Sequence, residues 1–454
     1  MNALQETVEE CVKRSKPRPH SKHWWNSDLK IMRKALNKLR VDSYRYRAVT
    51  THPSHRKLRK ASNEYGEAIV ATKKQHWTSY LEEMTANDIW TANRYLKEPS
   101  GDGGTPRIPT IRVIGDANGE TLVSDNNEKA KLFARTFFPP PPLHTSVPLN
   151  HEYPAPLPSP SQITAQQIEE QIRRLSPYKA PGQDEIQNIV LQKCLDLILD
   201  YLLHIFRAIL NLGTYYDPWR ESITIILRKP GKPSYETAKA YRPIALLSTV
   251  AKVLTAIVAE DMSRLVEYHQ LLPNTHFGGR PGRATTDAIH YLLQRIKEAW
   301  QKDMVASVLF LDVEGAFPNA VTDRLIHNLR RRRIPTIYIN FIKQLLSNRR
   351  TKLKFDDYTS EAFDILNRIG QGDPLSMLLY IIYNADLLQI TGDETKEDSL
   401  GFVDDIALIA VGKDFNETTR RLRDMMTKEE GGLQWSKEHN SKFEVSKSVV
   451  MHAS

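Results

Sequence analysis

The sequence predicts an α+β fold, in which helices pack on one face of a small and mainly antiparallel sheet. From residue 164 onward, short runs of strand-forming residues alternate with longer segments that have a helical period. Two of these short runs lead into aspartates, at Asp312 and at the pair Asp404 and Asp405. The 454 residues, 40% hydrophobic and 26% charged, are enough to bury a sizeable core.

Residues 1–100 are predicted to form a basic helical region. Apolar residues recur at helical spacing between the basic ones, at Leu29, Met32, Leu36 and Leu39. About a third of the positions from Lys13 to Lys60 are Lys or Arg. Basic and aromatic side chains together can hold nucleic-acid phosphates and stack on bases. Helix packing is nevertheless the favoured explanation for the interleaved aromatic residues, and a solvated face is the favoured explanation for a charge run alone.

Residues 101–160 are predicted to contain a hairpin and a proline-rich linker. The apolar runs 111–114 and 121–123 flank a turn with Gly, Asp and Asn, which is the pattern of a hairpin. A helix is expected over 127–138, and the prolines at 139–142 end it. Prolines recur up to residue 160, so this stretch is either a linker or an extended loop bound to the surface.

Residues 161–300 contain most of the remaining expected helices. These cover 165–175, 186–212 as one or two helices, 249–268 and 285–301. β-Branched residues at 223–227 predict a strand that leads into a basic segment with Lys229 and Lys232.

The acidic strand ends are the strongest functional signal. An apolar strand over 308–311 ends in Asp312, and a helix is expected at 322–330. Apolar runs on both sides of Asp404 and Asp405 predict a β-hairpin whose turn holds the acidic pair out of the sheet. An ordinary Asp-Asp turn explains this pair alone. Because neighbouring carboxylates repel each other, three of them on two strand ends favour a two-metal phosphoryl-transfer site with Mg²⁺.

Charge and cysteine usage narrow the class of protein. The net charge of +9 and the pI of about 9.2 favour an anionic partner, and nucleic acid is the usual one. The two cysteines form no zinc-binding pattern and fit a reducing compartment. No apolar run reaches membrane-spanning length, and the first residues lack the plan of a secretion signal. An intracellular protein without a membrane partner is therefore expected.

Several motifs, in a fixed order, resemble those of the reverse transcriptases of non-LTR (LINE-type) retrotransposons. Residues 240–247 are similar to the family's YRPISLL, 277–285 to FGFRPGRST, 310–317 to its first aspartate motif, 370–376 to GxPLSP and 402–405 to its aspartate-pair box. Trp24-Trp25 and residues 137–140 look like the segment that precedes the polymerase in these elements. The resemblance therefore covers most of the chain.

The resemblance implies a right-hand polymerase fold, with fingers at 161–300 and a palm at 301–454. It implies an RNA-directed DNA polymerase that uses an RNA template, a DNA primer or target, and dNTPs. A location in the nucleus and in cytoplasmic ribonucleoprotein is expected. The chain ends before the family's thumb, so the alternative is a truncated, catalytically inactive remnant that retains RNA binding. A group II intron maturase is less favoured, because the N-terminal context matches the LINE-type layout.

The resemblance also assigns catalytic roles. The expected ligands of two Mg²⁺ ions, for which Mn²⁺ can substitute, are Asp312, Val313 through its carbonyl, Asp404 and Asp405. Lys447 aligns with a late lysine that protonates the leaving pyrophosphate, although Lys442 lies close by. Departures from the family pattern at Gly279, Pro318 and Met377 remove no metal ligand.

The residues that the resemblance assigns to the incoming nucleotide are Lys229, Lys232, Arg242, Phe317, Gln371 and Gly372. Phe317 is expected to act as a steric gate against the ribose 2′-hydroxyl, with a place in the core as the alternative. Arg242, with Lys229 or Lys232, is expected to neutralise the triphosphate, since guanidinium groups bind phosphate oxygens bidentately. The glycine permits a close backbone approach in the nucleotide pocket.

Overall fold

The structure of the chain is a computed structural model that describes residues 24–46, 49, 51–82, 107–114 and 120–454. These residues divide into two units: one lies within Cys11–Arg107, and the larger one contains Ile108–Ser454. Much of the basic N-terminal stretch predicted from the sequence, including Lys13 to Lys22, lies outside the described residues. No described helix has the length and apolar character needed to cross a membrane.

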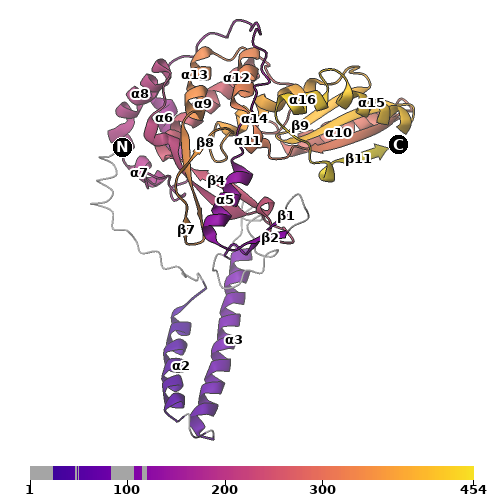
Figure 1. Cartoon of the computed structure of the whole chain (residues 1–454). Helices are drawn as coiled ribbons and strands as arrows, with labels where there is room; N and C mark the ends of the chain where they lie inside the picture. Colours follow the sequence, from indigo (N-terminus) through magenta and orange to yellow (C-terminus); the bar gives the residue numbers. More distant parts are fainter. Residues whose placement is uncertain (1–23, 47–48, 50, 83–106, 115–119) are drawn as a thin grey trace. The chain divides into compact units, whose positions relative to one another are not determined.

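The smaller unit is a helical hairpin, as Figure 1 shows. Its helices are α2 (Ser27–Arg45) and α3 (Pro53–Glu82). The side chain of Asn26 caps α2 by accepting the N–H of Leu29. Leu29 and Leu36 are 1% and 2% exposed, so the apolar spacing seen in the sequence does mark the buried face of a helix. The prediction of helices is confirmed for these described residues.

The larger unit contains two larger sheets and one small hairpin. The strands of the four-stranded antiparallel sheet are, in spatial order, β11 (Val449–Ala453), β5 (Val305–Asp312), β10 (Asp405–Gly412) and β9 (Glu397–Phe402). The strands of the five-stranded sheet are β4 (Tyr241–Leu246), β3 (Glu221–Arg228), β6 (Arg349–Phe355), β7 (Tyr358–Thr359) and β8 (Phe363–Ile365). Within it, only the β3–β6 pair is parallel. The predicted hairpin is formed by β1 (Ile111–Ile114) and β2 (Glu120–Val123).

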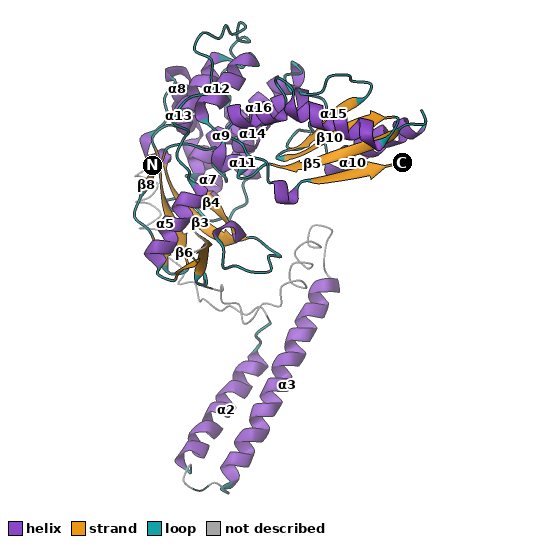
Figure 2. Cartoon of the chain, turned by 45° about the vertical axis from the view of Figure 1, so that its right-hand side comes forward, coloured by secondary structure: helices purple, strands orange, loops and turns teal. Residues whose placement is uncertain are grey.

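Helices surround these sheets, as Figure 2 shows, which confirms the predicted α+β class. The α-helices are α5 (Asn126–Phe137), α6 (Ala165–Arg174), α7 (Asn188–Lys193), α8 (Leu195–Leu212), α9 (Thr249–Tyr268), α10 (Thr285–Trp300), α11 (Ala316–Asn319), α12 (Thr322–Arg331), α13 (Thr336–Leu346), α14 (Ser376–Asn384), α15 (Phe415–Thr427) and α16 (Gly432–Glu438). Short 3₁₀ turns are η1 (Asp217–Arg220), η2 (Ala238–Ala240), η3 (Ala385–Gln389) and η4 (Val445–Lys447).

The expectation that helices cover one face of the sheet is wrong for the four-stranded sheet. On one face, Leu408 of β10 packs with residues of α15 and α16. On the other, Ile409 packs with residues of α10. The physical reason is the unbroken apolar run of β10, whose residues 406–412 are all buried, so neither face of the strand can be left to water.

The proline-rich stretch up to residue 160 is bound to the surface of the larger unit. The N–H of Leu157 donates to the carbonyl of Arg333 at 2.8 Å, and the Tyr153 hydroxyl lies 2.9 Å from His327 Nδ1 on α12. Of the two alternatives drawn from the sequence, the bound extended loop is therefore the one found. The predicted division at residue 300 stays a prediction; the five-stranded sheet takes strands from both sides of it.

Candidate active site

The acidic pair lies at the turn between β9 and β10. The two turn residues are Val403 and Asp404, whereas Asp405 is the first residue of β10, so only Asp404 is held out of the sheet. Val403 has a φ of +62°, a strained conformation for a β-branched residue. Its side chain is 9% exposed within the main core, and its carbonyl accepts a hydrogen bond from the Asn384 amide. Packing and this bond therefore hold the strained turn in place.

Asp312 lies directly opposite Asp405 in the β5–β10 pair. Residues that face each other across an antiparallel pair point to the same side of the sheet, with Cβ atoms about 4.5–5.5 Å apart. The two carboxylates are therefore brought to one side of the sheet, next to the turn that holds Asp404.

The charges of these three carboxylates act on one another. Burial, followed by the charges of Asp405 and Asp312, raises the pKa of Asp404 above its ordinary value. Burial and the charge of Asp312 raise the pKa of Asp405. The Lys447 ammonium opposes both shifts, and its Nζ lies 2.8 Å from Asp312 Oδ2. This is a site whose negative charge is only partly neutralised by the protein.

The donor set suits a hard divalent cation, because carboxylate and carbonyl oxygens are the ligands that Mg²⁺ prefers. Continuing the β5–β10 register places Val313 opposite Asp404. Among the described residues, the carbonyl oxygen of Val313 accepts no backbone hydrogen bond outside the strand ladders. The neighbouring Asp312 and Glu314 bond instead to residues 442–444. Within the described ranges, however, no group of three or more Asp, Glu, His or Cys side chains is arranged to hold a metal ion. The Asp312 carboxylate is instead paired with the Lys447 ammonium.

Phe317 lies beside this acidic site. Its ring stacks on that of Tyr380 of α14, with centroids 4.7 Å apart and planes at 23°. Phe317 is partly exposed, whereas Tyr380 is fully buried, and within the described residues its hydroxyl has no hydrogen-bond partner. Burial, followed by the charge of Asp404, raises the pKa of Tyr380 well above its ordinary value, which places this hydroxyl in the field of the acidic turn.

Basic residues of the β3–β4 hairpin are close enough to act on the acidic site. Burial and the charges of Lys232, Lys447 and Arg242 lower the pKa of Lys229, while Asp312 raises it. The tip of the hairpin reaches the end of β5, where Lys239 Nζ lies 2.7 Å from Glu314 Oε1. Lys229 therefore lies in the field of Asp312 and of the neighbouring cations Lys232 and Arg242, whereas contact of these cations with a triphosphate stays a prediction.

Gln371 and Gly372 lie against strand β4. The carbonyl of Gln371 accepts the N–H of Ala245 at 2.9 Å. Gly372 has a φ of +116°, and a Cβ there would lie 2.5 Å from the carbonyl oxygen of Ala245. The close approach that requires glycine is therefore to the backbone of β4. Contact of either residue with a nucleotide stays a prediction.

The loop of the second motif supports the acidic turn. Phe277 N–H donates to the Gly401 carbonyl at 2.8 Å, and a Cβ on Gly278 would lie 2.6 Å from Val403 N. Sequence reasoning missed this support, and it missed Tyr380 and Lys239 as neighbours of the site. The apolar run around Tyr380 is typical of a core helix, and nothing local signals its stacking on Phe317.

Residues 227–454 match the family described as reverse transcriptase (RNA-dependent DNA polymerase). Over 58% of its length the chain is 29% identical to a probable RNA-directed DNA polymerase from transposon BS of Drosophila melanogaster, of which 30% is covered. Over 49% of its length it is 32% identical to a probable RNA-directed DNA polymerase from transposon X-element of the same species, of which 24% is covered. The chain thus spans less than a third of the length of these relatives.

Solved structures also resemble the chain. A structure of apo telomerase from Candida tropicalis, truncated from its C-terminal domain, shares 12% identity and a TM-score of 0.39, and the match covers 52% of this chain and 51% of that one. The family match covers half of the 454 residues. It includes the acidic strand ends, the β3–β4 hairpin from Leu227 near the end of β3 onward, and the Gln371–Gly372 loop. The chain therefore belongs to the reverse transcriptase (RNA-dependent DNA polymerase) family.

Proposed function

We propose that the chain is the fingers-and-palm part of an RNA-directed DNA polymerase of a non-LTR retrotransposon, which extends a DNA primer or target on an RNA template with dNTPs. The observation that supports this most is the pairing of Asp312 with Asp405 beside the Asp404 turn, with the Lys447 ammonium 2.8 Å from Asp312. The family match and the names of the relatives agree with it. Fingers at 161–300 and a palm at 301–454 are part of the proposal.

Asp312 and Asp404 are proposed to hold two Mg²⁺ ions, or Mn²⁺ in their place, with the Val313 carbonyl and Asp405 supporting the site. When bound, such ions activate the attacking 3′-hydroxyl and stabilise the leaving pyrophosphate. Loading requires the Asp312 carboxylate to leave the Lys447 ammonium, which is 2.8 Å away. Lys447 is then free to donate a proton from Nζ to the pyrophosphate oxygen.

The incoming nucleotide is proposed to bind between the β3–β4 hairpin and the acidic turn. Lys229, Lys232 and Arg242 neutralise its triphosphate, and their mutual repulsion in the free protein fits a site that is completed by an anion. The Phe317 ring excludes a ribose 2′-hydroxyl, and Tyr380 supports that ring from behind. Gln371 and Gly372 form part of the pocket wall.

The basic helical hairpin is proposed to bind template or element RNA through phosphate contacts. It carries Lys and Arg along both helices. Affinity for RNA should therefore fall steeply with salt, and deletion of the basic region from Lys13 to Lys60 should flatten this slope. The proposed location of the protein is the nucleus and cytoplasmic ribonucleoprotein.

Single-nucleotide incorporation tests the proposal. The chain is given a DNA primer on an RNA template with dNTP or rNTP, in EDTA, Mg²⁺ or Mn²⁺. We expect incorporation of dNTP that requires the metal, and its loss in Asp404→Asn with RNA affinity retained. Phe317→Ala should admit rNTP, because the ring that meets the 2′-hydroxyl is removed.

Asp424→Asn is a matched control, since Asp424 is an exposed aspartate of α15 and lies outside the β5–β10 strand pair and the β9–β10 turn. A chain that binds RNA normally but incorporates nothing with either metal would favour the inactive remnant. Unchanged sugar selectivity in Phe317→Ala would refute the gate alone and leave the polymerase assignment standing.

A further inference from the structure

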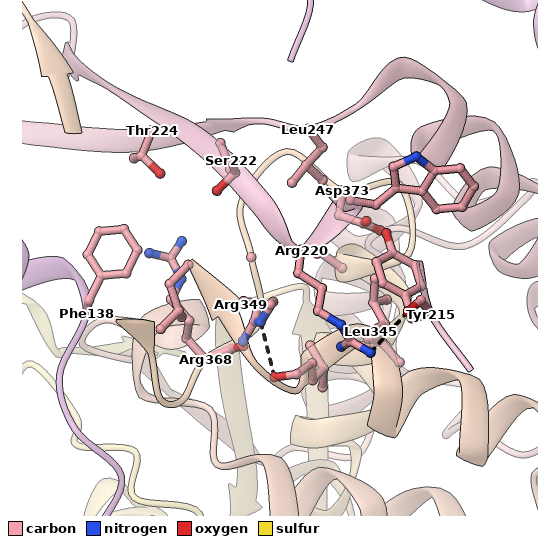
Figure 3. Close-up of a pocket in the computed structure, with 17 residues that line it drawn as sticks. Phe138, Tyr215, Arg220, Ser222, Thr224, Leu247, Leu345, Arg349, Arg368 and Asp373 are labelled. Atoms are coloured by element: carbon pink, nitrogen blue, oxygen red, sulfur yellow. Dashed lines mark hydrogen bonds between the residues drawn. The ribbon is translucent and has the colours of Figure 1, made fainter. Parts of the chain in front are cut away.

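A cavity of about 50 Å³ lies in the larger unit beside the five-stranded sheet (Figure 3). A water needs roughly 10–15 Å³ of such volume, so the cavity has room for about four waters or one small tetrahedral ion. Its wall includes Ser222 and Thr224 of β3, and Ala245 of β4. Figure 3 shows polar side chains from several segments arranged around it.

Positive charge dominates the lining of this cavity. Three guanidinium groups, those of Arg220, Arg349 and Arg368, line it together with a single carboxylate, that of Asp373. The Arg220 side chain is paired with Asp217 at 2.9 Å. Asp373 already accepts the N–H of Leu375 at 2.8 Å. The lining therefore contains more cationic than anionic groups.

Arg368 is the most unusual of these residues. It is 3% exposed and has a φ of +97°, which is strained for a residue with a long side chain. Its guanidinium donates to the Phe137 carbonyl at 3.1 Å and lies 4.5 Å from the centre of the Phe138 ring. Among the described residues, no carboxylate is within ion-pair distance of it. A buried charge of this kind is unfavourable unless a counter-ion is supplied.

Arg349, which is partly buried, adds a second guanidinium group to the lining of the cavity. It donates to the carbonyls of Leu346, at 3.2 Å, and Arg368, at 2.6 Å, and has no ion pair within the described part of the chain. Burial lowers the pKa of Arg349 to about 10, and burial with the charge of Arg349 lowers that of Arg368 to about 9. Both values lie above neutral pH, so both groups stay charged.

We propose that this cavity binds a phosphate-type oxyanion between Arg349 and Arg368. Guanidinium groups match tetrahedral oxyanions because their N–H donors lie in a planar fork. The anion is either free inorganic phosphate or a phosphodiester of a nucleic-acid strand. A strand is a reasonable source because Gly370 and Ala245 line the cavity and adjoin the Gln371–Gly372 loop. The site does not depend on polymerisation, and its tests are binding measurements.

The first test uses inorganic phosphate as the probe. The Tm of the full chain is compared in phosphate and in chloride at equal ionic strength. We expect phosphate at ten times its Kd to raise the Tm by about 2 °C. The rise should be lost in Arg368→Met and kept in Arg350→Met, since Arg350 is an exposed neighbour on β6 that does not line the cavity. Equal Tm values in phosphate and chloride would overturn the proposal of a phosphate site.

The second test separates the two sources of the anion. The affinity for single-stranded RNA is measured against salt concentration for the parent and Arg368→Met. A strand phosphate in the cavity predicts a slope of log K against log salt that is smaller by about 0.7 in the variant. An unchanged slope together with the phosphate-dependent Tm rise assigns the site to free phosphate. If a folded Arg368→Met variant keeps both the phosphate-dependent Tm rise and the salt slope of the parent, the proposal is wrong. The arginines would then be structural residues around bound water.

Circular dichroism shows whether Arg368→Met is folded. If it is not, Arg368→Lys replaces it, because lysine keeps the charge and loses the planar fork. Phosphate affinity in that variant should fall about tenfold. Unchanged phosphate affinity in Arg368→Lys would exclude the bidentate site.

Discussion

Replacing Asp405 by Asn should stabilise the metal-free protein while it removes a carboxylate from the proposed active centre. In the free chain, Asp405 faces Asp312 directly across the β5–β10 pair, and the charge of Asp312 raises the electrostatic cost of ionising Asp405. Asparagine has almost the same shape and no charge. Asp405→Asn therefore removes the repulsion and leaves the strand pairing intact.

The expected gain is modest and can be worked from the geometry. Like charges directly opposite in an antiparallel pair destabilise it by about 0.2–1 kcal/mol. Two unit charges about 5 Å apart in water repel each other by about 0.8 kcal/mol. Asp405 is exposed, and Lys447 already offsets part of the charge of Asp312, so the water limit applies. We expect Asp405→Asn to add about 0.5–1 kcal/mol to the free energy of unfolding.

Urea unfolding in EDTA and in Mg²⁺ measures this effect. The parent should gain about 1.4 kcal/mol from Mg²⁺ at ten times its Kd, because the ion binds the folded state only. Asp405→Asn should gain clearly less, so that Mg²⁺ reverses the order of stability of the two proteins. Asp424→Asn should behave as the parent does. An Asp405→Asn protein that is less stable than the parent in EDTA would refute the repulsion argument.

Further predictions concern the surroundings of the site. Tyr380→Phe should raise the free energy of unfolding by about 1 kcal/mol, because it removes a buried hydroxyl without a partner among the described residues. A lower free energy of unfolding in urea would show that the hydroxyl does have a hydrogen-bond partner. Gly278→Ala should lower the free energy of unfolding by about 2 kcal/mol, since the added Cβ would lie 2.6 Å from Val403 N. Its control is Gly66→Ala on α3, where a Cβ meets nothing within 4 Å, so that this change should be neutral or stabilising. His439 is buried, its Nδ1 lies 3.0 Å from the Trp435 carbonyl, and burial lowers its pKa to about 3. The unfolded chain then binds a proton that the folded chain does not, so the contribution of His439 to stability should fall below pH 6.5, by about 2 kcal/mol at pH 5. His439→Gln should reduce the pH dependence of thermal unfolding by this amount.

Local periodicity was sufficient to predict the long helices. The apolar pattern of 249–268 predicted a helix with the bounds that α9 has, and that of 285–301 predicted α10 to within one residue. Both helices bury a continuous apolar stripe, so local pattern and tertiary packing demand the same structure. The strand before Asp312 and the hairpin at Asp404 follow from the same logic, since strand-forming runs end at polar turns.

Features that depend on register or on distant segments could not be read from the sequence. The position of Asp405 inside β10, opposite Asp312, is set by how β5 and β10 pair, and shifting the pair by one residue would turn the side chains to the other face. Helices on both faces of the four-stranded sheet follow from the burial of β10, which the α+β expectation did not include. The stacking of Tyr380 on Phe317 joins residues 63 positions apart in a sequence of ordinary apolar composition.

The acidic turn illustrates why such distant contacts matter for the chemistry. Val403 adopts a φ of +62°, which an isolated hairpin of this sequence would disfavour. The turn is kept in this form by the Asn384 amide on its carbonyl and by the close backbone approach of Gly278. Packing in the core therefore holds the carboxylates in place in the metal-free protein. The folding stability of the whole unit outweighs the repulsion between them. In the proposed metal site the negative charge is therefore preorganised, and binding of a cation would require the Lys447–Asp312 contact to rearrange.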